Sequence, residues 1–146
     1  MQVRDIMTEN PVCCLPDATI QGAAGLMVEH DCGEIPVTDE QLHPLGIITD
    51  RDICCRAIAR GKNLETPVSE VMTGKVVTIR PQASIYNCYR AMEEDQIRRL
   101  LVVNEDRSIC GVVSQADLVR GIRFAQKNSE LLRQVSRSND APSMRH

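Results

Sequence analysis

The residues best suited to chemistry are a hydroxyl residue and an aspartate three positions later, a pair that occurs twice. The two pairs are Thr49 with Asp52 and Ser114 with Asp117, and each follows a short apolar segment that starts with glycine. At the start of a helix, free N–H groups face an anion and the hydroxyl donates one more hydrogen bond. The carboxylate accepts hydrogen bonds from both hydroxyls of a ribose. Each pair is therefore equipped to bind a ribose phosphate.

The same spacing also has a purely structural interpretation. Serine or threonine at the end of a strand is a good helix N-cap, and an acid three residues later completes a capping box. Aspartate in place of the more usual glutamate or glutamine favours the ligand, because a short carboxylate suits a diol better than it reaches back to the N-cap amide. Both interpretations stay open from the spacing alone.

The sequence contains an internal repeat, in which the second copy follows the first at an offset of 65 residues. The anchors are Ile6-Met7-Thr8 and Val71-Met72-Thr73, Pro16 to Ile20 and Pro81 to Ile85, and Gly46 to Ile53 and Gly111 to Leu118. A fixed offset without insertions between anchors indicates a duplicated structural unit. Any ligand cleft on one copy thus has an equivalent on the other.

Each copy is predicted to be a β-α-β-β-α unit in an α+β fold. We expect the first repeat over 1–61, a linker over 62–67, the second repeat over 68–122, and a basic C-terminal helical extension and tail over 123–146. A three-stranded sheet cannot bury both faces alone, so the two pseudo-symmetric units should pack sheet to sheet. The last helix should run to about Val135, and residues 136–146 should be unstructured.

Within each unit, an apolar run precedes a proline and an amphipathic helix, and two short strands follow. The predicted first helix carries the stripe Ile20, Ala23, Ala24, Met27 and Val28, and its counterpart carries Ile85, Cys88, Tyr89 and Met92. Spacings of three and four residues place these side chains on one helix face. Gly61 is predicted to end the second helix of the first unit.

These paired motifs resemble a tandem CBS domain pair, the Bateman module, over residues 1 to about 122. The resemblance includes Asp5-Ile6-Met7-Thr8, Glu70-Val71-Met72-Thr73, the Pro-x-Ala-[Ser/Thr]-Ile helix starts and Ile35-Pro36-Val37. It implies two CBS repeats, an adenine nucleotide (AMP, ADP, ATP or an NAD-type compound) as regulatory ligand, and no obligatory cofactor. S-adenosyl compounds are further ligands of that family.

The resemblance also implies which residues would form the site. Asp52 and Asp117 would hold ribose hydroxyls, and Thr49 and Ser114 would contact ribose or phosphate. The residues expected to line the adenine are Val12, Cys13, Pro36, Val77 and Thr78. Arg51, Arg98 and Arg99 are expected to converge on the central cleft and bind phosphate. Because Gly33 and Glu34 stand in the first copy where Arg98 and Arg99 stand in the second, we expect two unequal sites. Leu101 replaces the proline usual in that family.

The amino-acid composition and net charge limit the classes of partner, the location and the cysteine chemistry that we expect. The 146 residues include only three aromatics and carry a formal net charge of −3, which makes nucleic acid an unlikely partner. No apolar run is long enough to predict a membrane span or a signal peptide, so we expect a cytoplasmic protein. Seven cysteines without a C-x-x-C motif are expected to be mostly small buried hydrophobes, and no metal site is predicted.

We therefore predict a regulatory sensor that is not an enzyme. The histidines His30, His43 and His146 are scattered, and both glycine-rich phosphate-binding motifs are absent. Signalling would need a homodimer and an effector protein of unknown identity. The basic tail and its apolar residues Ile122, Phe124, Ala125, Leu131 and Leu132 offer a surface for either. The alternatives are an interaction scaffold without a ligand, and a redox or metal sensor that uses the cysteines.

Overall fold

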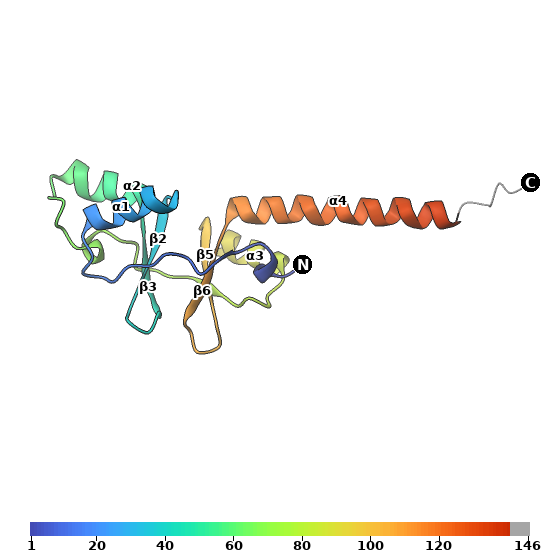
Figure 1. Ribbon diagram of the computed structural model, residues 1–146, viewed down its shortest axis with the longest axis horizontal. Coiled ribbons are helices and arrows are strands. Elements are labelled where there is room, and N and C mark those ends of the chain that lie inside the picture. The colour runs from blue at the N-terminus through green and yellow to red at the C-terminus, as the bar shows by residue number, and fades with distance from the viewer. Residues whose placement is uncertain (141–146) are drawn as a thin grey trace, which may run out of the picture.

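Each half of the chain folds into a helix, a β-hairpin and a second helix (Figure 1). The computed structural model describes the backbone of residues 1–140 and the side chains of residues 1–130 and 133–135. The first half contains α1 (Ile20–His30), β2 (Glu34–Thr38), β3 (Pro44–Thr49) and α2 (Asp50–Asp52), which continues as a π-helical turn (Ile53–Ala57) and a 3-10 turn (Ile58–Arg60). The second half contains α3 (Ile85–Asp95), β5 (Arg99–Val103), β6 (Ile109–Ser114) and α4 (Gln115–Asp140). The predicted repeat is thus confirmed in the order of elements.

The helices begin and end where short-range signals place them. Thr19 and Ser84 cap α1 and α3 by accepting hydrogen bonds from the Gly22 and Asn87 N–H groups, at 3.0 and 3.1 Å. Gly61, at φ 75°, ends the helical segment of the first repeat as predicted. One part of the predicted stripe on α1 does not face the core, because Val28 is 84% exposed.

The strands form two sheets that differ in their number of strands. Strand β5 lies between β4 (Thr78–Ile79), which runs parallel to it, and β6, which runs antiparallel. In the first repeat only β2 and β3 form a continuous ladder, and Cys14 makes a single parallel bridge to Val37 where β4 would lie. The predicted first strand is therefore reduced to one bridge.

The segment that leads into each repeat packs on the other repeat. Strand β1 (Thr8–Glu9) pairs with β6, and Thr73 makes the equivalent bridge to Ile47 of β3. The two 3-10 helices of these segments also pack on the other repeat. The helix at Val3–Asp5 contributes to the core of the second repeat, and the helix at Val68–Glu70 contributes to the core of the first. Each half of the molecule is thus completed by a segment from the other half of the sequence.

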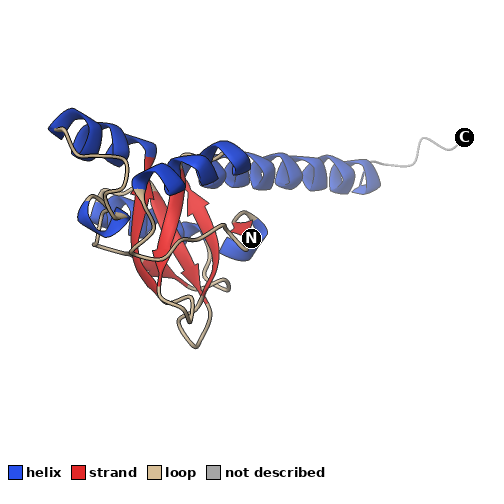
Figure 2. Cartoon of the chain, turned by 60° about the vertical axis from the view of Figure 1, so that its left-hand side comes forward, coloured by secondary structure: helices blue, strands red, loops and turns tan. Residues whose placement is uncertain are grey.

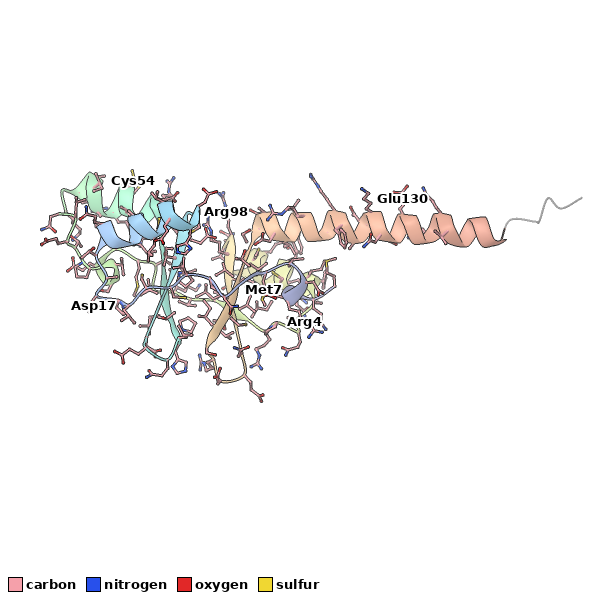
Figure 3. The ribbon with its side chains drawn as sticks, viewed as in Figure 1. Arg4, Met7, Asp17, Cys54, Arg98 and Glu130 are labelled. Carbon is pink, nitrogen blue, oxygen red and sulfur yellow. The ribbon has the colours of Figure 1, made fainter. Side chains whose placement is uncertain are left out.

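Two glycines make this exchange possible. A Cβ atom on Gly46 would lie 2.7 Å from the Met72 sulfur and 2.7 Å from the Thr73 carbonyl oxygen, and one on Gly111 would lie 2.5 Å from the Met7 sulfur. The space beside each glycine is therefore filled by a methionine of the leading segment (Met7 is labelled in Figure 3).

The two sheets pack face to face through a third, smaller core, as predicted. Leu101, Ile109 and Val112 of the second repeat form this core, with Cys13, Ile47 and Val76 packed against it. The helices lie outside the strands (Figure 2). A backbone hydrogen bond from the Ile109 N–H to the Leu42 carbonyl oxygen, 2.9 Å long, also joins the two hairpins.

Helix α4 extends well beyond the body of the molecule (Figure 1). It continues to Asp140, so the prediction that structure stops near Val135 is wrong for residues 136–140, and residues 141–146 lie outside the described part. Four of these five residues are weak helix formers, but extending an existing helix avoids the cost of nucleation, so the backbone remains helical for one more turn.

Candidate functional site

Asp52 and Asp117 occupy the same position in the two repeats, at the start of the helix that follows the hairpin. The Asp52 N–H donates to Thr49 Oγ1, and the Thr49 N–H donates to Asp52 Oδ2, both at 3.1 Å. Ser114 and Asp117 exchange the same two bonds at 3.1 and 2.9 Å. Both capping boxes of the structural interpretation are therefore present, and the short side chain of aspartate does not keep Oδ2 from the N-cap amide, so the preference for a ligand drawn from aspartate over glutamate loses its ground.

The other oxygen of each carboxylate faces an arginine of the same helical segment. Oδ1 of Asp52 lies 3.6 Å from Arg56 Nε, and Oδ1 of Asp117 pairs with Arg120. Both aspartates are largely buried, with side chains 11% and 14% exposed. A ribose hydroxyl that binds Oδ1 of either aspartate would have to share this oxygen with the arginine or displace the arginine from it. These two arginines were not predicted as site residues, although they stand four and three positions after the aspartates, a spacing that brings side chains together on a helix.

A cleft of about 230 Å³ lies beside Asp117, between the two repeats. Its walls come from the leading segment, the end of α1, the start of β2 and the second repeat. They are Thr8, Glu9, Asn10, Pro11, Val12, His30, Cys32, Glu34, Val112 and Asp117. Val12 of the first copy thus shares a cleft with Asp117 of the second, because the leading segment crosses to the other repeat.

The other residues expected to line an adenine have different surroundings. Cys13 packs between the sheets, and its Sγ donates to the Pro11 carbonyl oxygen over 3.3 Å. Pro36 is buried in β2, where its carbonyl oxygen accepts from the Cys14 N–H at 3.0 Å. Val77 packs against the core of the second repeat, and Thr78 is exposed on β4.

The three arginines expected to bind phosphate lie in different environments. Arg99 Nε is 2.5 Å from Glu34 Oε2, so this guanidinium already has a partner from the other repeat. Arg98, labelled in Figure 3, lines a groove of about 530 Å³. Tyr89, Glu93 and Gln115 are among the other residues of its lining. Arg51 is exposed. Convergence on one cleft stays a prediction for Arg51 and Arg98.

A larger apolar groove, of about 790 Å³, lies between α1 and the helical segment after β3. Its apolar lining consists of Ala24, Met27, Val28, Ile53 and Ile58, with the thiols of Cys32 and Cys54 beside them. The groove lined by Arg98 is its counterpart in the second repeat at the 65-residue offset, but polar and charged residues replace several apolar ones there. The helical surface of the first repeat is therefore the more hydrophobic of the two.

The cysteines divide into buried and exposed thiols. Cys14 and Cys88 are buried, and burial raises the pKa of each to about 11, with smaller contributions from Cys13 and Asp117 respectively. Burial also raises the pKa of Cys13 to about 11. Cys54 and Cys55 are exposed. Within the described part of the chain, no cluster of three or more His, Cys, Asp or Glu side chains is arranged to hold a metal ion.

The duplicated fold agrees with the comparisons to known proteins. A family model of the CBS domain matches residues 3–56 and again residues 68–123. The chain belongs to the CBS domain family. The CBS domain-containing protein YhcV of Bacillus subtilis is 36% identical over 137 residues, which span 94% of this chain and 96% of that protein.

Solved structures of similar proteins have the same fold. Hypoxic Response Protein I with two coordinated zinc ions superposes with a TM-score of 0.73 at 33% identity, over 82% of this chain and 98% of that one. The curated Mycobacterium tuberculosis protein, Hypoxic response protein 1, is 37% identical over 120 residues, 80% of this chain and 82% of its own. The CBS domain pair of MJ0100, in complex with 5′-methylthioadenosine and S-adenosyl-L-methionine, has a TM-score of 0.75 at 28% identity, over 84% and 99% of the two chains.

Among the described residues of this CBS domain pair, no helix combines the length and apolarity needed to cross a membrane.

Proposed function

We propose that this CBS domain pair is a regulatory module that binds an adenine nucleotide, with AMP, ADP, ATP or an NAD-type compound as the ligand. It is not an enzyme; it signals through homodimerisation and an effector protein. Thr49, Asp52, Ser114 and Asp117 hold the ribose and phosphate groups. Arg51, Arg98 and Arg99 bind phosphate, and Arg99 exchanges Glu34 for it. Val12, Cys13, Pro36, Val77 and Thr78 form the surroundings of the base.

The observation that carries this proposal is the cleft between the repeats beside Asp117. Its lining combines the Asp117 carboxylate, near the N-terminus of α4, with an apolar wall that contains Val12 and Val112. A nucleoside needs both a flat apolar wall for the base and a carboxylate for the ribose diol. The relation to MJ0100, whose CBS domain pair is solved with two adenosine compounds, supports the same ligand class.

Thermal unfolding in the presence of nucleotides tests the proposal. A ligand at one hundred times its dissociation constant adds about 2.7 kcal/mol to the free energy of unfolding, so the melting temperature should rise with at least one adenine compound. The panel is AMP, ADP, ATP, NAD(H) and S-adenosylmethionine, with GTP as the base control. The rise should be lost in the Asp52→Ala/Asp117→Ala double variant.

The matched control is Asp17→Ala, since Asp17 is an exposed aspartate that does not line the cleft. This variant should keep the full response. If the nucleotide-free protein shows no shift with any adenine compound, the function is instead that of an interaction scaffold.

Homodimerisation is proposed through the exposed helical surface of the first repeat. Val28 is 84% exposed and Ile58 is 51% exposed, and both line the apolar groove described above. A charge at Val28 leaves the core untouched, so Val28→Asp should keep the free energy of unfolding of the subunit while shifting the chain from dimer to monomer. Sedimentation equilibrium measures the change, and a Val28→Asp variant that remains dimeric would place the interface elsewhere.

A further inference from the structure

We propose that Glu34 is an internal competitor for the phosphate of the ligand, so that the chain distinguishes phosphorylated from unphosphorylated adenosine compounds. In the structure Glu34 pairs with Arg99. A phosphate replaces the Glu34 carboxylate on Arg99, whereas an adenosine compound without a phosphate leaves the ion pair intact. This inference rests on the proposed function and concerns the regulation of that same site.

The ion pair joins two equivalent positions of the repeats. Glu34 and Arg99 are 65 positions apart and stand first in β2 and β5. Glu34 Oε2 lies 2.5 Å from Arg99 Nε. Equivalent residues that contact each other lie at the pseudo-two-fold axis that relates the two repeats. A ligand bound between the repeats therefore meets this pair.

The strand register places Arg99 beside the site residue Ser114. The two residues are directly opposite in the β5–β6 ladder, so their side chains share a face and their Cβ atoms are about 4.5–5.5 Å apart. Two residues further along these strands, Leu101 and Val112 are also opposite and belong to the core between the sheets. Arg99 and Ser114 thus lie on the same inner face, and Val112 of that face lines the cleft beside Asp117.

Glu34 lines this cleft itself, and two of the three carboxylates there are already paired with arginines. Asp117 pairs with Arg120. Glu34 pairs with Arg99, and the third carboxylate, Glu9, is exposed. A phosphate that replaces Glu34 on Arg99 therefore gains a cation and leaves the Asp117 carboxylate in place for the ribose.

The ion pair is weak enough for a phosphate to displace it. The side chains of Glu34 and Arg99 are 22% and 38% exposed, and a pair that water reaches in this way contributes at most about fivefold to an equilibrium constant. Arg99 Nε is buried, yet it makes no aligned hydrogen bond within the described part of the chain. Glu34 thus neutralises the guanidinium without satisfying it. A phosphate offers more charge and more acceptor oxygens, and it suits the planar donor fork of arginine.

Displacement of Glu34 also removes a link between the repeats. One repeat supplies the carboxylate and the other supplies the guanidinium, so a phosphate on Arg99 changes the contacts between them. Adenosine occupies the base and ribose positions and leaves these contacts unchanged. A ligand shifts an equilibrium between two arrangements only through its different affinity for them, and here the phosphate supplies that difference.

Calorimetric titration of the full, nucleotide-free chain with AMP and with adenosine tests the inference, because the two compounds differ only in the phosphate. Glu34→Gln should strengthen AMP binding about fivefold, since the phosphate no longer has to displace a carboxylate, and should change adenosine binding less than twofold. Arg99→Gln should weaken AMP binding at least fivefold and again leave adenosine unchanged. Circular dichroism checks that each variant is folded.

Two control variants separate exchange of the ion pair from simple charge repulsion. Glu9→Gln removes the exposed carboxylate of the same cleft and should change the AMP affinity less than twofold. Glu94→Gln removes a carboxylate that forms an exposed ion pair with Arg90 on α3, and it should change neither affinity.

The competition is refuted, while nucleotide binding stands, if Glu34→Gln changes the ratio of the AMP and adenosine affinities by less than twofold. The same conclusion follows if Glu9→Gln strengthens AMP as much as Glu34→Gln does, or if Arg99→Gln leaves the AMP affinity unchanged. If the unmodified chain binds neither compound, the inference is refuted. A chain that also fails to respond to the wider adenine panel refutes the proposed function itself.

Discussion

Replacing Gly46 with alanine tests whether the leading segments hold the two repeats together. The new Cβ atom would lie 2.7 Å from both the Met72 sulfur and the Thr73 carbonyl oxygen. Methionine can move, but Thr73 is held at both backbone groups: its carbonyl oxygen accepts from the Ile47 N–H at 3.0 Å, and its N–H donates to the Ile47 carbonyl oxygen at 2.9 Å. The crossing segment must therefore shift away from β3.

The loss in the free energy of unfolding caused by Gly46→Ala has two contributions. Overpacking a filled site costs about 1–3 kcal/mol, and each backbone hydrogen bond weakened at the bridge adds up to about 1 kcal/mol. We expect Gly46→Ala to lower the free energy of unfolding by roughly 2–4 kcal/mol.

Urea denaturation followed by far-UV circular dichroism measures the change. Gly25→Ala is the matched control, because Gly25 lies inside α1 with nothing within 4 Å of the added Cβ atom. Removing a helical glycine there should stabilise the protein by about 0.5–1 kcal/mol. If Gly46→Ala proves as stable as the unmodified protein, the bridge between Ile47 and Thr73 is not a tight contact and the argument is wrong.

Two further predictions concern a buried thiol and an ion pair between the repeats. Burial, and secondarily the charge of Asp117, raises the pKa of Cys88 from its usual 9.0 to about 11, so folding favours the protonated thiol. Its contribution to stability is fully present below pH 9 and is lost as the pH rises toward 11. The unmodified protein should therefore lose more stability than Cys88→Ala in urea titrations between pH 8 and 11, and parallel losses would contradict the burial of this thiol. For the ion pair between the repeats, a double-mutant cycle with Glu34→Gln and Arg99→Gln should give a coupling of about 1 kcal/mol, since both side chains are partly exposed; additive effects would show that the pair contributes nothing.

The repeat, the order of elements and the ends of several helices could be predicted because they depend on residues close together in sequence. Thr49 and Asp52 are three positions apart, so spacing alone brings both onto one helical turn. Gly61 ends its helix because it accepts a positive φ without strain. The same local information gave the resemblance to CBS domains, which the family match confirms.

The composition of the clefts could not be predicted in this way. Val12 lies with Asp117 because the leading segment crosses to β6, a pairing between residues about one hundred positions apart. Arg99 meets Glu34 because the two sheets pack face to face, which brings the first residues of β2 and β5 together. Spacing within a repeat determines which side chains share a helix or a strand, whereas only packing of the two repeats against each other determines which charges share a cleft.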